Sequence, residues 1–434
     1  MIRNKKPLSV NVVTLGCSKN LVDSENLMAR LTKGGFDVKA DDPEDTDIVI
    51  INTCGFIHDA REESIDTILE YAALKSQGRI KKLLVMGCLS QRYPKELKTE
   101  IPEADGMFGV EQQSDILTFL GSSCHDQVIP SRFVTTGHYA YLKIAEGCDR
   151  HCSFCAIPMI RGKHKSRKED DILNEFAFLT GSGVKEILLI SQDLSYYGYD
   201  LYRESRLASL LEKMAKSRDD IWIRLHYAYP SRFPEDILPL IRENSNICRY
   251  LDIPFQHISD PILKSMRRGI NKKETLELID KIRSEVPGIA LRTSLMVGYP
   301  GESEAMFREL VRFVEETRFN RLGVFTYSQE ENTEAAKLMD DVPAGIKQER
   351  MDIIMGIQEK ISEDLNRQMT GKDIRVLIDR REGEYLVGRT EFDSPEVDNE
   401  VLIRKPWDES WIGSFVKARA EDSGPYELYA GIVS

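Results

Sequence analysis

Residues 139–158, YAYLKIAEGCDRHCSFCAIP, open a series of strands and helices and contain a group of cysteines. The run Tyr139–Ala145 predicts a strand, and the thiols of Cys148, Cys152 and Cys155 follow it within a span of eight residues. Cysteine thiolates are the usual ligands of iron–sulfur clusters, and a complete cage needs four of them. Three thiolates leave one iron open, as catalytic metal sites do. The stretch therefore predicts a cluster whose open iron chelates the amino and carboxylate groups of a methionine.

A structural zinc site and buried free cysteines are the alternatives to a cluster here. His151 would supply the fourth ligand of a zinc ion. The gaps between the cysteines are three residues and then two, whereas zinc-binding pairs are commonly separated by two. The spacing therefore favours the cluster.

Strands and helices alternate along the middle of the chain. The predicted strands are Tyr139–Ala145, Lys185–Ser191, Trp222–Tyr227, Arg249–Pro254, Ala290–Met296 and Arg321–Tyr327. The predicted helices between them include Glu169–Leu179, Leu207–Lys216, Lys273–Glu285 and Glu304–Thr317. This alternation indicates a parallel sheet with helices on its faces. Six units are too few for the usual eight-stranded barrel, so we expect an open, partial (β/α)6 barrel that admits a bulky substrate.

The first 130 or so residues alternate in the same way and predict a separate parallel-sheet domain. Strands are expected at Val10–Leu15, Ile48–Thr53 and Lys82–Met86, and helices at Asn20–Lys33, at about Asp59–Lys75 and from near Tyr93. Cys17, Cys54 and Cys88 each follow one of these strands. Because ligands bind in the crevice at the carboxyl ends of parallel strands, we expect these thiols to converge there on a second cluster with an open iron.

The alternative for these three cysteines is that they are small apolar residues buried near the sheet edge. Gly16 and Gly87 precede two of them and Gly55 follows the third, and this repeated context favours the cluster. Cys124 and Cys248 lack such a context, and we expect Cys248, at the start of a barrel strand, to serve packing.

The last part of the chain has a different character. A helical pattern from about Lys347 to Met369 leads to Gly371, and short predicted strands separated by turns follow at 374–378, 385–389, 400–403, 415–420 and 427–432. They indicate a small antiparallel β-barrel. We therefore expect an α/β protein with an N-terminal cluster domain over residues 1–132, a partial barrel over 133–370 and a β-barrel over 371–434.

Composition limits where and with what the protein works. The 434 residues carry a net charge of −12, with 41% hydrophobic and 30% charged residues, which suits a globular protein of two or three domains. We see no secretory signal and no stretch near the roughly 18 apolar residues of a membrane helix, so we expect a cytoplasmic protein without a membrane partner. The charge argues against broad adhesion to nucleic acid and fits a basic partner, although solubility explains it equally well.

The segment from Glu146 to Pro158 resembles the signature of the radical S-adenosylmethionine (SAM) superfamily, whose partial barrel would cover residues 140–368. The resemblance implies that Phe154 lies beside the adenine, and that Gly298 and Gly301 of the segment GYPGE contact it. Many members carry Gly-Gly-Glu after the second strand to contact the methionine amino group. This chain departs from that pattern with Ser191-Gln192-Asp193, where Gln192 and Asp193 are the candidates.

Three further segments narrow the resemblance to the methylthiotransferase family. They are TLGCSKN at 14–20, NTCGF at 52–56 and GCL at 87–89. The family implies two [4Fe–4S] clusters, one on each cysteine triad, and a C-terminal TRAM domain. One SAM donates a methyl group to sulfur, and a second is cleaved to a 5′-deoxyadenosyl radical that removes hydrogen from an unactivated carbon. The resemblance implies that sulfur held at a cluster on Cys17, Cys54 and Cys88 is then delivered to that carbon, and that the cofactor performs the hard step while the protein positions it.

The segments CSKNLVDS at 17–24 and CGFIHDA at 54–60 are similar to the branch that modifies an aspartate β-carbon in the twelfth protein of the small ribosomal subunit. The other branch modifies an adenosine in tRNA. Residues 371–434 hold 9 Lys and Arg against 14 Asp and Glu, a net of −5, whereas a tRNA-binding barrel should be basic. An acidic barrel suits a basic ribosomal protein. We therefore expect that protein and an external electron donor as partners, and disfavour tRNA.

Two interpretations stay open. A cluster-containing ribosome-binding protein without radical chemistry is the alternative of a different class. The basic run Arg161–Lys168 (RGKHKSRK) is either a solvated loop or a site for a carboxylate substrate, the cofactor or phosphate.

Overall fold

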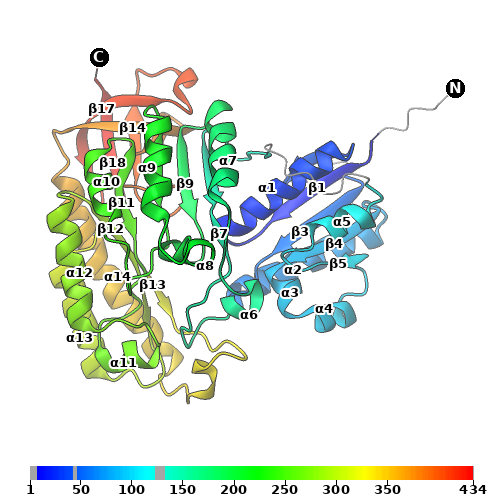
Figure 1. The fold of residues 1–434 in the computed structure, drawn as a ribbon, viewed down its shortest axis with the longest axis horizontal. Helices are drawn as coiled ribbons and strands as arrows, with labels where there is room; N and C mark the ends of the chain where they lie inside the picture. The colour runs from blue at the N-terminus through cyan, green and yellow to red at the C-terminus, as the bar shows by residue number, and fades with distance from the viewer. Residues whose placement is uncertain (1–6, 43–45, 123–131, 434) are drawn as a thin grey trace. The chain divides into compact units, whose positions relative to one another are not determined.

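The structure, a computed structural model, describes residues 7–42, 46–122 and 132–433. These residues form two compact units (Figure 1). The first unit runs to Thr136 and also includes Glu146–Asp149 and Ala156–Lys163, and the second unit contains the rest of the chain. Each unit is built around a parallel sheet, which confirms the predicted α/β class. Within the described residues, no helix combines the length and the apolar composition needed to cross a membrane.

The first unit holds a five-stranded sheet in the order β2-β1-β3-β4-β5, with every pair parallel. Its strands are β1 (Ser9–Thr14), β2 (Asp37–Ala40), β3 (Ile48–Thr53), β4 (Lys82–Gly87) and β5 (Gly106–Met107). Its helices include α1 (Ser18–Lys33), α2 (His58–Ser76), α3 (Cys88–Arg92), α4 (Pro94–Glu100) and α5 (Gln113–Phe119). The three predicted strands are confirmed. β2 and β5 were not predicted, because strands of four and two residues show too little hydrophobic pattern in the sequence.

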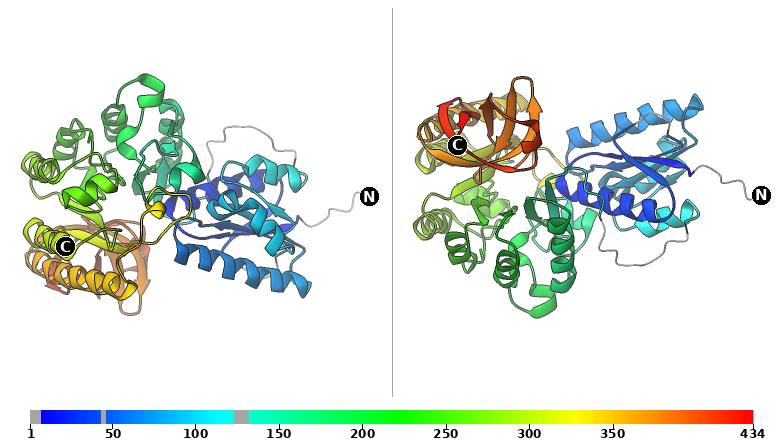
Figure 2. Two further views of the ribbon diagram at one scale, coloured as in Figure 1. Left: turned by 90° about the horizontal axis from the view of Figure 1, so that it is seen from below. Right: turned by 90° about the horizontal axis from the view of Figure 1, so that it is seen from above.

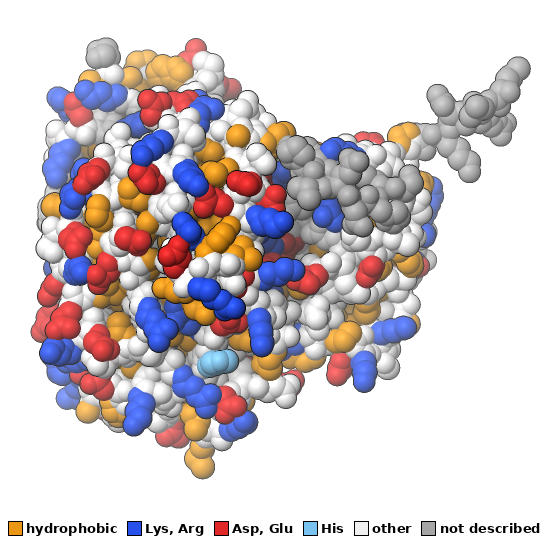
Figure 3. Space-filling model, viewed as in Figure 1, with side chains coloured by type: hydrophobic (Ala, Val, Ile, Leu, Met, Phe, Trp, Pro, Cys, Tyr) orange, Lys and Arg blue, Asp and Glu red, His pale blue; other side chains and the backbone are white. Residues whose placement is uncertain are grey.

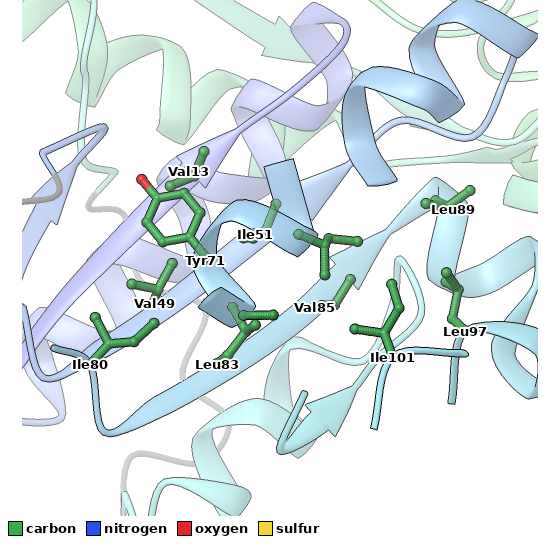
Figure 4. Close-up of a cluster of buried hydrophobic side chains, with 12 residues drawn as sticks. Val13, Val49, Ile51, Tyr71, Ile80, Leu83, Val85, Leu89, Leu97 and Ile101 are labelled. Atoms are coloured by element: carbon green, nitrogen blue, oxygen red, sulfur yellow. The ribbon is translucent and has the colours of Figure 1, made fainter. Parts of the chain in front are cut away.

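Apolar side chains cover both faces of this sheet. On one face, Val49 and Ile51 of β3 pack with Tyr71 of α2 (Figure 4). On the other face, Ile50 of β3 packs with Leu27 of α1. Successive residues of a strand point to opposite faces, so a strand buried on both sides must be apolar throughout. This explains the unbroken run IVII in β3.

The second unit contains six parallel strands in the order β13-β12-β11-β10-β9-β6, which form an open sheet. They are β6 (Tyr139–Lys143), β9 (Glu186–Ile190), β10 (Trp222–Leu225), β11 (Ile247–Asp252), β12 (Ala290–Val297) and β13 (Arg321–Thr326). Two short strands, β7 (Ala145–Glu146) and β8 (Lys165–Ser166), lie between β6 and β9 along the chain. The six predicted barrel strands are thus confirmed.

Helices follow the strands of this sheet. They are α7 (Glu169–Gly181), α8 (Tyr199–Tyr202), α9 (Leu207–Ser217), α10 (Ile237–Glu243), α11 (Asp260–Ser265), α12 (Lys272–Glu285), α13 (Glu304–Thr317) and α14 (Ala344–Arg367), while the short α6 (Ile157–Arg161) belongs to the first unit. Side-chain caps fix two starts. The Asn271 side chain accepts from the Glu274 N–H at the start of α12, and that of Ser303 accepts from the Met306 N–H at the start of α13. On the face of the molecule drawn in Figure 3, Lys and Arg side chains are interspersed with Asp and Glu side chains, as expected of a surface in contact with solvent.

The C-terminal strands close into a barrel in the order β14-β15-β16-β18-β17 (Figure 2). They are β14 (Asp373–Glu382), β15 (Tyr385–Arg389), β16 (Glu400–Arg404), β17 (Phe415–Ser423) and β18 (Glu427–Ile432). Four neighbouring pairs are antiparallel, as predicted, and β16 pairs with β18 in parallel. A closed ring of five strands cannot alternate direction all the way round, so one parallel pair is unavoidable.

Buried charges fasten this barrel to the sheet of the same unit. Glu186 of β9 accepts from Arg224 Nε of β10 at 2.6 Å and from Arg389 Nη1 of β15 at 2.6 Å. All three side chains are at most 3% exposed. The guanidiniums hold the pKa of Glu186 below its usual value although burial opposes this. Trp222 and Phe415 pack beside this network, with ring centroids 4.7 Å apart.

Candidate metal centres

Three cysteines of the first unit lie at the carboxyl ends of adjacent strands. Cys17 follows β1 and precedes α1, Cys54 directly follows β3, and Cys88 directly follows β4 as the first residue of α3. Because β1, β3 and β4 are neighbours in a parallel sheet, their carboxyl ends share one edge. The fold therefore brings these three predicted residues together.

Glycines allow the close approach of the three strand ends. Gly16 has a φ of +88°, and a Cβ on it would lie 2.7 Å from Cys54 Cβ and 3.0 Å from Cys54 Sγ. Gly87 has a φ of +105°, and a Cβ on it would lie 2.6 Å from the Thr53 carbonyl oxygen. Each of these glycines thus avoids both a strained backbone and a clash with the next strand end. This explains the glycine context that the sequence shows around the cysteines.

The three thiols differ in exposure. Cys17 is exposed, whereas Cys54 and Cys88 are buried. Burial raises the pKa of the Cys54 thiol, and it raises that of Cys88 to about 11 against the opposing charge of the Arg161 guanidinium. Cys17 adds to the rise of the pKa in both cases.

Arg161, the first residue of the basic run, is buried in the first unit. Its Nη1 lies 3.0 Å from Asp23 Oδ2 and 3.0 Å from Glu146 Oε1, and its Nη2 donates to Asn20 Oδ1 at 2.5 Å. Cys88 Sγ also lies 3.7 Å from that Asn20 oxygen. Burial opposes the charge of Arg161, but the carboxylates hold its pKa above the usual value. The sequence alone does not connect this arginine with the N-terminal triad, because 141 residues separate Asn20 from Arg161.

The other residues of the basic run differ in exposure. Lys163 and Lys165 are exposed. His164 and Ser166 are buried in the second unit, where His164 Nε2 lies 3.1 Å from Ser166 Oγ. A role of this run in binding a carboxylate or phosphate stays a prediction.

The central cysteines occupy a loop that contributes to both units. In the first unit, the backbone N–H of Cys148 donates to the Gly162 carbonyl at 3.1 Å. In the second unit, the Cys155 N–H donates to the Cys152 carbonyl at 3.1 Å, which closes a tight turn. All three side chains are partly exposed. None of the three residues is fully buried.

Arg268 and Tyr229 surround Cys152 within the second unit. Arg268 Nη1 donates to Cys152 Sγ at 3.2 Å, and the Tyr229 hydroxyl lies 3.5 Å from the same sulfur. The Tyr229 hydroxyl donates to the Arg268 carbonyl at 2.8 Å. Arg268 is 3% exposed and Tyr229 8% exposed. No sequence motif predicts that either residue lies here, because both reach the sulfur from loops far along the chain.

The two segments that the sequence assigns to adenine meet in the second unit. Phe154 packs against a buried cluster that includes Tyr299. The Tyr299 hydroxyl lies 2.9 Å from Ser153 Oγ, next to Phe154. Tyr299 stands between Gly298 and Gly301, at φ of +70° and +84°. The predicted neighbours therefore lie close together.

Buried polar groups hold the GYPGE turn in shape. Glu302 accepts from the Gly298 N–H, from Arg350 Nη1 at 3.0 Å and from His257 Nε2 at 3.3 Å. The Gly301 N–H donates to Asp341 Oδ1 at 2.7 Å. The turn is thus pre-formed rather than a mobile loop.

The residues after β9 take different roles. Asp193 is buried and accepts from the Ser195 N–H at 3.0 Å and from Arg150 Nε at 2.7 Å. Arg150 belongs to the cysteine loop, so Asp193 holds that loop in place. Gln192 is partly buried beside it, and its contact with a methionine amino group stays a prediction.

A single metal ion fits the N-terminal triad poorly. In the described part of the chain, only His58, Asp59 and Glu62 bring three possible ligand atoms within 4.8 Å of one another, and all three are exposed. A zinc ion with ligands at about 2.3 Å needs such proximity, whereas a cluster spaces its thiolates over several irons. Cys248 is 1% exposed in an apolar cluster, which confirms its packing role, and Cys124 lies outside the described residues.

Comparisons with known proteins cover nearly the whole chain. Residues 9–109 match the Uncharacterized protein family UPF0004, residues 142–314 the Radical SAM superfamily and residues 370–433 the TRAM domain. The Ribosomal protein uS12 methylthiotransferase RimO of Bacteroides fragilis is 52% identical over 431 residues, which are 99% of this chain and 100% of the relative. The protein of the same name from Porphyromonas gingivalis is 51% identical over 98% of this chain and 99% of its own. The chain belongs to the ribosomal protein uS12 methylthiotransferase family.

Membership confirms the predicted radical SAM and TRAM regions, and it implies a [4Fe–4S] cluster and SAM as cofactors. Solved structures agree on the fold. The radical SAM methyltransferase TsrM of Kitasatospora setae aligns with a TM-score of 0.56 at 14% identity, over 81% of this chain and 89% of that one. The radical enzyme OxsB aligns with a TM-score of 0.53 at 13% identity, over 82% of this chain and 56% of that one.

Proposed function

We propose that this chain is a radical SAM enzyme that adds sulfur and a methyl group to the β-carbon of an aspartate in ribosomal protein uS12. The observation that carries the proposal is the full-length similarity to relatives named for that protein, at 52% identity over 99% of this chain. The chain also offers two sets of three thiolate ligands for iron–sulfur clusters. One set follows β6, and the other lies at the ends of β1, β3 and β4.

Cys148, Cys152 and Cys155 would hold the cluster that binds SAM. Three thiolates suit a [4Fe–4S] cluster with one open iron. The Arg268 contact on Cys152 supports this fit, because a buried cation beside the sulfur favours a thiolate over a thiol. When bound, the cluster and SAM supply the one-electron chemistry needed to break an unactivated C–H bond, and the chain positions them.

Cys17, Cys54 and Cys88 would hold a second [4Fe–4S] cluster, where the sulfur to be inserted is kept. Their shared sheet edge, the clearance that Gly16 and Gly87 provide and the exposure of Cys17 support this assignment. The exposure of Cys17 suits a centre that must receive sulfur and meet a substrate.

Phe154, Gly298 and Gly301 would line the adenine site, and Gln192 the methionine end. Tyr299 links the glycine turn to the cysteine loop through Ser153, so the adenine site and the cluster ligands would be held in one frame. The chain's own task is thus to fix SAM relative to the cluster.

The substrate assignment has a runner-up, a tRNA adenosine methylthiotransferase. The net charge of −5 over residues 371–434 supports the protein substrate, because a tRNA-binding barrel would need cationic contacts to phosphate. The names of the relatives favour it as well. The reaction would take place in the cytoplasm, where the ribosome is, with electrons from an external donor.

Mass spectrometry tests the proposal directly. After anaerobic reconstitution with iron, sulfide, SAM and dithionite, uS12 should gain a methylthio group on one aspartate, and unmodified tRNA should gain none. Cys148→Ala should abolish 5′-deoxyadenosine formation, while Cys88→Ala should leave it intact and stop sulfur insertion. Modified tRNA with unmodified uS12 would establish the runner-up, and clusters without any 5′-deoxyadenosine would establish a binding protein.

A further inference from the structure

Arg268 occupies an unusual place beside one of the proposed cluster ligands. It follows α11 and is 3% exposed, and its Nη1 donates to Cys152 Sγ at 3.2 Å. Its Nη2 donates to the Pro254 carbonyl. In the described part of the chain no carboxylate pairs with Arg268, and its Nε has no hydrogen-bond partner. A positive charge is therefore buried against the sulfur without a carboxylate to balance it.

Tyr229 fixes this guanidinium in place. The Arg268 guanidinium carbon lies 4.3 Å from the centroid of the Tyr229 ring, and the Tyr229 hydroxyl donates to the Arg268 carbonyl. Tyr229 thus holds Arg268 in two ways. Its ring stacks on the guanidinium, and its hydroxyl hydrogen-bonds to the backbone. A buried charge without a carboxylate partner is screened less than a charge at the surface, so it acts more strongly on its neighbours.

We propose that Arg268 is a positioning residue that raises the reduction potential of the cluster ligated by Cys152. The inference rests on the proposed function, since it requires the cluster on Cys148, Cys152 and Cys155. Reduction adds one negative charge to the cluster. A buried cation that donates a hydrogen bond to a ligand sulfur stabilises the reduced form more than the oxidised form. Arg268 thereby makes the cluster easier for an external donor to reduce.

A redox titration followed by electron paramagnetic resonance tests this. The parent for the experiment is the full chain with Cys17→Ala, Cys54→Ala and Cys88→Ala, so that only one cluster contributes. In this parent, Arg268→Gln should lower the ratio of reduced to oxidised cluster at least tenfold at a fixed potential, equivalent to about 59 mV for a one-electron couple.

The neighbouring Arg267→Gln is the matched control. It removes the same charge one residue away, but Arg267 is 53% exposed and lies 3.4 Å from Glu334. Solvent and this partner screen its charge, so the ratio should change less than threefold. An Arg268→Gln protein that binds a full complement of iron and keeps the parent potential would overturn the inference.

A second measurement does not depend on the variant's folding. With ¹⁵N-arginine incorporated into the parent, electron spin echo modulation of the reduced cluster should show a weak ¹⁵N coupling through the hydrogen bond. The absence of that coupling in a loaded, reduced parent overturns the inference even if Arg268→Gln fails to bind iron. A parent that binds no iron at all would instead remove the proposed ligand set, so the two failures are distinguishable.

Discussion

Replacing Gly87 by alanine should empty the N-terminal centre while the central cysteines keep their cluster. Gly87 ends β4 directly before Cys88, with φ +105° and ψ −157°. A Cβ built there would lie 2.4 Å from Asn52 Oδ1 and 2.6 Å and 2.8 Å from the Thr53 carbonyl oxygen and nitrogen. Two of these three atoms are backbone of β3 and cannot rotate away. The strand ends that carry Cys54 and Cys88 must therefore separate.

The free-energy cost of Gly87→Ala in the native structure has two parts. The backbone conformation of Gly87 is nearly exclusive to glycine, and a side chain there costs about 1–3 kcal/mol. Real Cβ contacts essentially never fall below 3.0 Å, so the 2.6 Å approach to the Thr53 carbonyl oxygen demands a backbone shift of about 0.4 Å. Relieving such a clash in a packed region costs about 1–3 kcal/mol more. The clash is relieved if the ends of β3 and β4 move apart. A cluster that bridges Cys54 and Cys88 opposes this movement.

Iron and sulfide analysis of chains carrying Cys148→Ala, Cys152→Ala and Cys155→Ala isolates the N-terminal centre. In that background, Gly87→Ala should bind little iron. Gly78→Ala is the matched control, because Gly78 has a φ of +74° and a Cβ there meets nothing within 4 Å. It should lose about 1–2 kcal/mol of stability and keep its iron. Equal iron content in the two variants would refute the role assigned to close approach.

Two further predictions concern the second unit. Glu186→Gln should lower the free energy of unfolding by about 3–5 kcal/mol in a denaturant titration, because the fully buried carboxylate balances both Arg224 and Arg389. The exposed Glu212→Gln should change it little, and a similar small change in both variants would contradict this reasoning. His226 is buried with Nδ1 3.6 Å from Asp252 Oδ2, and burial lowers the pKa of its ring below 6.5. Below pH 6.5 the His226 ring takes up a proton in the unfolded chain but resists it in the folded chain. The free energy of unfolding therefore decreases as the pH falls, by at most about 1.4 kcal/mol per pH unit. The stability difference between the parent and His226→Gln should therefore shrink from about pH 7.5 to about pH 5.5, and a difference independent of pH would contradict the assignment.

The positions that the sequence predicts well are those whose surroundings are local or repeated. The run IVII in β3 is apolar because both faces of the sheet are covered, and this is visible in four letters. The approach of Cys17, Cys54 and Cys88 follows from topology, since parallel neighbouring strands end at one edge. The glycines beside them mark the same edge. These features need no knowledge of long-range packing.

The residues that sequence reasoning missed reach the centres from far along the chain. Arg161 appears in the sequence only as part of a basic run, yet it pairs with Asp23 across 138 residues. Arg268 lies 116 residues from Cys152, in a stretch without a motif. The parallel pairing of β16 with β18 was also missed, although five strands in a closed ring require one such pair. The number of strands alone would have predicted the parallel pair. No local sequence pattern predicts the positions of the two arginines.

These two arginines show how the chain can tune its two proposed centres differently. Arg161 lies near Cys88, but Asp23 and Glu146 neutralise it, so it contributes little net charge there. Arg268 contacts Cys152 and has no carboxylate partner in the described part of the chain. A neutralised cation leaves the potential of a nearby cluster almost unchanged, while an unbalanced buried one raises it. An electron from an external donor should then settle on the central cluster, where SAM is cleaved, rather than on the N-terminal cluster, which only needs to hold sulfur.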